Sequence, residues 1–481
     1  MAPKSIQKNA VLSSIKTVLS LLIPLITFPY ITRVLQVEAI GKQNFAVSVV
    51  GYFLLLADLG IVVYAIREGT KLRDDRQEIS RFASEMLVIH MISAGISLVL
   101  LFCAATFVPK LSDYKLLILI LSGQILLSVF SRSWIYNVYE DFGFITLMQA
   151  LFQILSVVAL LLFVRSSKDL YLYTVTYLIS VSGANLVYGL RSSVYVDLKP
   201  VAFSALKGHI KPILIIFASS LTITIYVHSD VTILGWLVGD EAVGLYSTSV
   251  KVYGIVKNVI AAIITVTIPR LTQYAGTAAF RPFFHKLFKA LALMILPAVT
   301  GLFLLRENVI RIIAGPEYIA AASSLGFLSI AMGASLFATL YANGVLIPYS
   351  KEKAFLFATL VSATVNIVLN FLLIPRFQQN AAAFTTLIAE VVVLLICYLH
   401  ARKDAPLKGL GSSLLKVLVG CGAIAAVCLG IQMLHLSLCW ETIVCIGASV
   451  IVYSAVQLLF KNEVFMQLFR SAFRFIKKKQ G

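Results

Sequence analysis

Charged residues are scarce in this chain of 481 residues, and their scarcity excludes an ordinary soluble protein. Only 13% of the residues are Asp, Glu, Lys or Arg, whereas 59% are hydrophobic, and a typical soluble domain has about 25% charged residues. Acidic residues are especially few, 22 against 40 basic residues, so the net charge is +18. The basic residues lie in short loops between apolar runs rather than on one amphipathic face, so we expect no nucleic-acid partner. The composition predicts a protein that crosses a membrane many times.

Other missing features argue against enzymatic and metal functions. The six cysteines form no CxxC pair and have no histidine at metal-ligand spacing. The sequence contains no Walker A motif, so it encodes no ATPase of this type. No loop predicted to lie outside the cell is longer than about fifteen residues, and membrane polymerases usually need a larger one. We therefore expect no catalytic residues, no metal and no cofactor.

Long apolar stretches fill the sequence that remains. Windows of about twenty residues, the length of a helix that spans a bilayer, recur about fourteen times. They lie near 11–32, 44–66, 82–108, 116–137, 144–164, 170–190, 213–236, 242–268, 290–313, 321–347, 354–375, 381–400, 413–434 and 441–460. The sequence thus predicts an all-α integral membrane protein with about fourteen transmembrane helices.

Lysine and arginine gather in alternate loops, and this bias places both termini in the cytoplasm. A short repeat divides the chain, because EAIG at 38–41 precedes the second predicted helix and EAVG at 241–244 precedes the eighth. Six predicted helices separate the copies, so the two halves share one orientation, as in transporters with a central cleft. We expect one six-helix bundle at 1–212, a second at 213–405, and two further helices with a basic tail at 406–481.

Polar residues recur on one face of the eighth predicted helix. Ser247, Lys251 and Asn258 follow one another at steps of four and seven residues, which stacks them along the helix. Lys257 lies on a different face of the same helix. Hydrocarbon penalises a charge near mid-helix unless the charge lines a protein-enclosed cavity. We therefore predict that these side chains line a cavity that binds an anionic head group.

Other predicted helices contribute further polar residues to this prediction. Tyr226 and Asp230 share a stripe on the seventh helix, while Lys16 and Arg132 lie on the first and fourth. Carboxylates within apolar segments are candidates for a coupling-ion site, and they are Asp58, Asp230 and Glu390.

The alternative is that each charge is half of a structural ion pair. Asp230 with Lys251 and Asp58 with Lys16 would be such pairs. For Asp58, Lys16 and Arg132, which lie nearer to helix ends, the side chain can also reach the membrane surface.

Particular strings resemble Wzx-type polysaccharide flippases. TFPYITRVL at 27–35, followed by Gly41 and FA at 45–46, resembles their first two helices, and YAIREG at 64–69 resembles the end of the second. Further matches lie at 229–235, 244–246, 344–353 and 366–375, so the resemblance covers the first twelve predicted helices. The family is part of the MOP (multidrug/oligosaccharidyl-lipid/polysaccharide) exporter superfamily, whose members consist of two six-helix bundles.

Two departures from the family pattern are visible. The family often has glycine at the position of Gln36, and a glycine-rich turn at the position of 378–381. We expect the turn between the eleventh and twelfth helices to be stiffer or differently shaped here.

The resemblance implies that the chain translocates undecaprenyl-diphosphate-linked oligosaccharide repeat units, of O-antigen or capsule, from the cytoplasmic to the outer leaflet of a bacterial inner membrane. Transport would proceed by alternating access through a cationic central cavity, where Lys251, Lys257 and Arg132 replace the hydration of the diphosphate. An ion gradient or the membrane potential would supply the energy. Implied partners are membrane lipid, a polysaccharide polymerase and a chain-length regulator.

Two other functions remain open at this stage. A cation-coupled multidrug extruder would have the same fold, although a cationic cavity suits its typically cationic substrates poorly. A membrane glycan polymerase or ligase is the alternative from another class, and the short outside loops argue against it.

Overall fold

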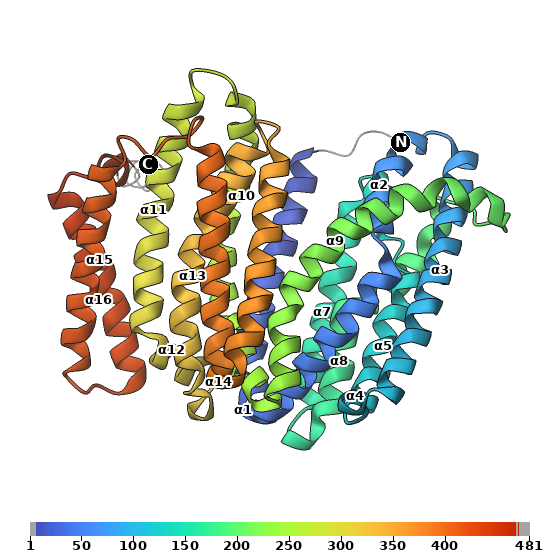
Figure 1. The fold of residues 1–481 in the computed structure, drawn as a ribbon, viewed down its shortest axis with the longest axis horizontal. Helices are drawn as coiled ribbons and strands as arrows, with labels where there is room; N and C mark the ends of the chain where they lie inside the picture. The colour runs from blue at the N-terminus through green and yellow to red at the C-terminus, as the bar shows by residue number, and fades with distance from the viewer. Residues whose placement is uncertain (1–5, 468–469, 471–481) are drawn as a thin grey trace, which may run out of the picture. The chain divides into compact units, whose positions relative to one another are not determined.

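The described part of the chain consists mainly of long helices (Figure 1). The computed structural model describes the backbone of residues 6–467 and 470, and the side chains from Ile23 onward except that of Ser219. Within these residues there is no β-strand, and eleven helices are long and apolar enough to cross a bilayer. The predicted all-α membrane fold is confirmed, whereas the count of fourteen crossings stays a prediction.

Contacts divide the chain into two units, Met1–Gly244 and Leu245–Gly481. The first unit holds α1 (Ile6–Asp58), α2 (Ile61–Leu72), α3 (Arg76–Phe107), α4 (Pro109–Ser112), α5 (Lys115–Val129), α6 (Ser133–Val138), α7 (Phe142–Phe163), η1 (Ser167–Asp169), α8 (Leu170–Arg191), η2 (Ser192–Val194), α9 (Phe203–Leu237) and the first turn of α10 (Asp240–Tyr274). The second unit holds the rest of α10, α11 (Phe280–Leu304), α12 (Arg306–Ile313), η3 (Pro316–Tyr318), α13 (Ala321–Tyr341), the π-helical turn η4 (Ala342–Leu346), α14 (Glu352–Ala401), α15 (Gly411–Gln432) and α16 (Leu438–Leu459). The two units are defined by contacts between residues, so they do not test the predicted six-helix bundles at 1–212 and 213–405, which stay a prediction.

Two of the helices are each interrupted by a glutamine. α1 has 53 residues and breaks at Gln36 (φ 67°, ψ 174°), and α14 has 50 residues and breaks at Gln378 (φ 51°, ψ −131°). A straight helix of that length would measure about 75 Å, more than twice the hydrocarbon thickness of about 30 Å. The predicted windows 354–375 and 381–400 fall within α14, on either side of its break. The predicted window 44–66 begins in α1 after Gln36 but runs past the end of α1 at Asp58 into α2. Glycine would suit both positions, since it adopts positive φ without strain.

The two copies of the repeat cross each other inside the first unit. A Cβ atom on Gly41 would collide with the backbone carbonyl of Asp240, and a Cβ atom on Gly244 would collide with the backbone carbonyl of Val37. Each glycine thus contacts the residue four positions before the glycine of the other copy. This close approach of the two backbones requires residues without side chains, and the interpretation of 38–41 and 241–244 as a repeat stays a prediction.

Buried tyrosines tie the helices together at the end of the first unit where α3 begins. Tyr136 donates its hydroxyl hydrogen bond to the carbonyl of Tyr188 at 3.0 Å, and Tyr188 donates to the carbonyl of Ile145 at 3.0 Å. Both tyrosines are almost fully buried. Their hydroxyls satisfy backbone carbonyls where water is absent, and they join α6, α8 and α7.

Candidate functional site

The exposed surface of α10 is divided into a polar strip and an apolar strip. Lys251 and Asn258 are exposed, and Ser247 is half-buried on the same face. A Cβ atom on Gly254, between them, would meet no atom within 4 Å, so there is open space at this point. About a quarter to a third of a turn away, the exposed residues of α10 are apolar: Val259 (54% exposed), Ile263 (38%) and Val266 (78%). The polar strip is therefore distinct from the surface that suits lipid.

Lys251 and Ser247 each have an unused polar group. Within the described part of its unit, Lys251 forms no ion pair or hydrogen bond, whereas the oxygen of Ser247 is buried and has no hydrogen-bond partner among the described residues. An unsatisfied buried hydroxyl costs about 1–3 kcal/mol. The ammonium of Lys251 is available to a polar ligand, whereas the hydroxyl of Ser247 would become available only if its side chain turned toward the surface.

Lys257 lies on a different side of α10, where it is partly buried and paired. Its Nζ lies 3.4 Å from Oε1 of Glu390 in α14 and donates a 2.8 Å hydrogen bond to the hydroxyl of Tyr253. The Glu390 side chain is only 12% exposed. The pair neutralises two charges that apolar surroundings would otherwise penalise. For Lys257 and Glu390 the structural ion-pair interpretation is thus correct, although their predicted roles in binding and coupling stay untested.

Arg132 supports the end of α8. Its Nη1 donates to the carbonyl of Gly189 at 2.8 Å and to Oγ of Ser192 at 2.7 Å, a favourable place for a cation because helix carbonyls converge there. The predicted helix at 116–137 was wrong in its second half. α5 ends at Val129, and the chain leaves the helix at the residues that let Arg132 reach α8.

The remaining predicted site residues belong to the first unit, and the side chain of one of them is not described. Asp230 is buried in α9 and Tyr226 is half-buried there. A carboxylate oxygen of Asp58, the last residue of α1, lies 3.3 Å from Nε2 of His90, and the proposed pair of Asp58 with Lys16 stays a prediction. The side chain of Lys16 falls outside the described residues.

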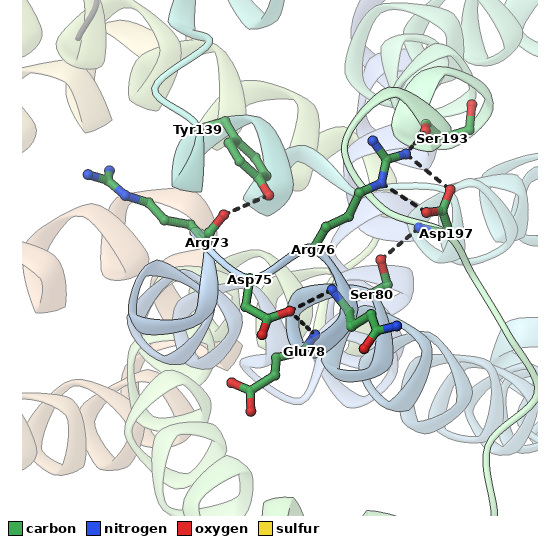
Figure 2. A network of polar contacts seen from close by, with 9 residues as sticks. Arg73, Asp75, Arg76, Glu78, Ser80, Tyr139, Ser193 and Asp197 are labelled. Carbon is green, nitrogen blue, oxygen red and sulfur yellow. Dashed lines mark hydrogen bonds and ion pairs between the residues drawn. The ribbon is translucent and has the colours of Figure 1, made fainter. Parts of the chain in front are cut away.

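A polar network that the sequence analysis missed fastens the segment before α9 to α3 (Figure 2). Arg76 forms a two-pronged ion pair with Asp197, at 2.9 Å through Nε and 3.1 Å through Nη2. Ser80 accepts from the backbone N–H of Asp197 at 2.9 Å, and Ser84 accepts from that of Lys199 at 3.0 Å. Four helical residues advance about 6 Å and two residues of extended chain about 6.6 Å, so the serines match alternate N–H groups. The i, i+4 serine spacing was the signal available in the sequence.

The network continues into the first turns of α9. Glu85, which is buried in α3, accepts a hydrogen bond from Nε of Arg81 at 3.0 Å and another from Nε2 of His209 at 2.8 Å. Nδ1 of His209 in turn lies 2.8 Å from the hydroxyl of Tyr64. A neutral histidine that donates from Nε2 and accepts at Nδ1 satisfies both contacts. These bonds join α3, α9 and α2.

Comparisons with known proteins agree with this architecture. Residues 6–275 match the family described as polysaccharide biosynthesis protein. A protein named "Putative O-antigen transporter" from Escherichia coli (strain K12) is 21% identical over 281 residues, 56% of this chain and 65% of that protein, so the chain spans slightly less than two thirds of its length. A protein of the same name from Shigella dysenteriae is 21% identical over 370 residues, 76% of this chain and 92% of that protein.

A solved structure shares the fold. "Lipid II flippase MurJ, inward closed conformation" superposes with a TM-score of 0.73 at 15% identity, and the match covers 97% of this chain and 100% of that chain. The predicted MOP-type fold and the resemblance to Wzx-type flippases are confirmed by these matches. The family match covers more than half of the chain. This multi-pass membrane protein therefore belongs to the polysaccharide biosynthesis protein family.

Proposed function

We propose that the chain is a flippase that moves an undecaprenyl-diphosphate-linked oligosaccharide repeat unit from the cytoplasmic to the outer leaflet of a bacterial inner membrane. The family match, the named O-antigen transporter relatives and the shared fold of a lipid II flippase support a lipid-linked oligosaccharide as cargo. Such a cargo cannot enter hydrocarbon unaided, because every polar and ionised group would lose its water. The protein must therefore offer polar groups along the path.

The unpartnered Lys251 is the observation on which the proposal mainly rests. An exposed ammonium within a membrane-spanning helix, with no ion pair in the described part of its unit, needs an anion or water. A diphosphate fits this position, and the unsatisfied hydroxyl of Ser247 and the amide of Asn258 suit sugar hydroxyls. Typical multidrug substrates are cationic, so an extruder is the weaker candidate.

The membrane potential favours the proposed direction of transport. An inside-negative potential drives an anion outward by about 2.3 kcal/mol per charge per 100 mV. A returning proton or sodium ion would add to this, with Asp58, Asp230 and Glu390 as the candidate sites. The pairing of Glu390 with Lys257 makes Glu390 a carboxylate whose protonation would free a cation.

The test replaces Lys251 by alanine in cells that lack the native gene. A charge-assisted hydrogen bond is worth about 1.5–3 kcal/mol, so we expect surface polysaccharide export to fall about tenfold to a hundredfold at matched protein level. Lys251→Arg keeps the charge and should retain most of the export. The matched control is Lys416→Ala, which removes a lysine from α15, another membrane-spanning helix, and should have no effect.

Normal export by the Lys251→Ala protein would refute the assigned role of Lys251. Changed drug sensitivity with unchanged polysaccharide would instead indicate a multidrug extruder. If deletion of the gene left lipid-linked units reaching the outer leaflet and stopped only their joining, the protein would be a polymerase.

A further inference from the structure

A groove of about 750 Å³ opens at the end of the first unit where α3 begins. Its lining includes the cationic residues Arg76, Arg81 and Lys199, the acidic residues Glu85 and Asp197, and the small residue Ala202. The proposed transport site does not use this groove, which lies beside the network shown in Figure 2.

Positive charge exceeds negative charge at the groove. Asp197 is neutralised by Arg76, and Glu85 is neutralised by Arg81. Arg81 uses only Nε for this bond, its side chain is 73% exposed, and its terminal nitrogens form no hydrogen bond to a described residue. Lys199 is exposed and forms no ion pair with any described residue. Arg81 and Lys199 therefore flank the groove with N–H groups that can donate hydrogen bonds to an anion.

The first turns of α9 extend the positive charge along a helix. Lys207 and Lys211 are exposed on these turns, and neither forms an ion pair within the described part of the chain. Lys207 lies about one helical turn after Phe203 and Lys211 about two turns after it, on the same side of the helix. Pro212 follows them inside α9, where proline bends a helix, and Figure 1 shows α9 curving along its length.

The same side of α9 is also apolar. Phe203 is 73% exposed, Ile210 is 45% exposed and Leu214 is 48% exposed. Leu206 and Ile213, which lie about 60–80° around the helix axis from Phe203 in the direction away from the lysines, are buried at 5% and 1%. Bulk water disfavours such a row of apolar side chains, and hydrocarbon disfavours the lysines between them. Only a membrane surface satisfies both, because the apolar side chains enter the acyl region while the lysines reach the phosphates.

We propose that the groove binds the phosphate head group of an anionic membrane phospholipid. Lys199 and Arg81 bind the phosphate oxygens, Lys207 and Lys211 add attraction for the anionic surface, and the acyl chains lie against Phe203, Ile210 and Leu214. Free phosphate would leave the apolar row uncovered. An acidic protein would need to cover exposed hydrophobic side chains in the plane of the bilayer.

The test is a binding experiment on the purified full-length protein in a neutral detergent. Phosphatidylglycerol, phosphatidylcholine, a polyprenyl phosphate and inorganic phosphate are titrated separately, and bound molecules are counted by native mass spectrometry. One basic residue near an anionic surface contributes about fivefold in affinity. We expect retention of phosphatidylglycerol over phosphatidylcholine, and at least a tenfold loss of this preference in the K199Q/K207Q/K211Q protein.

Two controls separate the groove from general electrostatics. K286Q/K353Q/K408Q removes the same charge at exposed positions of the second unit and should keep the preference. Ala202→Trp fills the groove without a change of charge and should lower the preference for phosphatidylglycerol. Equal loss in both triple variants, equal retention of both phospholipids, or preferential binding of inorganic phosphate would each overturn the proposal. Polyprenyl phosphate bound at Lys251 should be retained by both triple variants, so a loss of polyprenyl phosphate binding in K199Q/K207Q/K211Q alone would also overturn it.

Discussion

At the scale of single residues, the glutamines that break α1 and α14 adopt a backbone conformation that is costly for them. Gln36 has φ 67° and ψ 174°, a region that glycine occupies almost alone, and Gln378 has φ 51°. Such a residue costs about 1–3 kcal/mol. Neighbouring contacts must hold these breaks in place, since the residue itself disfavours them.

We predict that Gln36→Gly stabilises the protein. The substitution relieves the backbone strain. Part of this gain is offset because glycine has greater conformational freedom in the unfolded chain, so the free energy of unfolding should rise by about 1 kcal/mol. Thermal unfolding of the purified protein in detergent measures the gain. Gln153→Gly, inside the regular helix α7, should instead destabilise by about 0.5–1 kcal/mol. A lower midpoint for Gln36→Gly than for the native chain would show that the break is not strained.

Single-residue partners were the least predictable part of the candidate site. Spacing on α10 separated Lys257 from the face of Lys251, and the structure places them on different sides. Spacing gives only the direction of a side chain, however, so Glu390, 133 positions away, could not be identified as the partner of Lys257. The same limit hid the pairing of Asp58 with His90.

At the scale of elements, hydropathy located the membrane helices well but misplaced their interruptions. A window average registers apolar length and does not register a single residue at positive φ, so it showed neither the breaks at Gln36 and Gln378 nor the end of α1 at Asp58, which the window 44–66 crosses. The split between α5 and α6 was missed because the residues around Arg132 remain mostly apolar. The docked segment before α9 has no periodic pattern of its own.

The Arg76–Asp197 ion pair predicts a pH dependence for this docked segment. The hydrogen bonds from Arg76 hold the pKa of the Asp197 carboxyl below its ordinary value, which is about 3.9. The folded pKa is depressed, so the stabilisation is complete above the ordinary pKa and is lost as the pH falls through the lower folded value. We expect hydrogen exchange of the segment before α9, corrected for intrinsic rates, to accelerate below about pH 4.

Asp197→Asn is the matched control for this prediction. It removes the carboxylate charge at every pH, so its exchange should already be faster at pH 7 and should lose the acid transition. If Asp197→Asn and the native chain were equally protected at pH 7, the ion pair would contribute nothing to docking.

At the scale of the whole molecule, the sequence predicted the membrane class, the helical fold and the family, because these depend on composition, hydropathy and short strings summed over many residues. It also located the EAIG and EAVG repeats. Their reciprocal crossing, in which Gly41 contacts Asp240 and Gly244 contacts Val37, required coordinates. The repeat is thus a point of close backbone approach in the fold.

We predict that Gly41→Ala is severely destabilising. The added methyl group meets backbone rather than a flexible side chain, so the helices must separate, at a cost of about 3 kcal/mol. Gly95→Ala is the matched control, because a Cβ atom there meets nothing within 4 Å. Thermal unfolding and the level of protein in the membrane measure both effects. Equal stability of the two variants would contradict the close crossing.

The fastening of the segment before α9 has a mechanical consequence. Ser80, Ser84 and Arg76 hold this stretch along α3, and the Glu85–His209 bond holds the beginning of α9 itself. The connection between α8 and α9 is therefore held in a fixed position and has no free length to accommodate a movement of α9. A tilt of α9 would consequently move α3 as well, because these polar bonds couple the two helices into one rigid body.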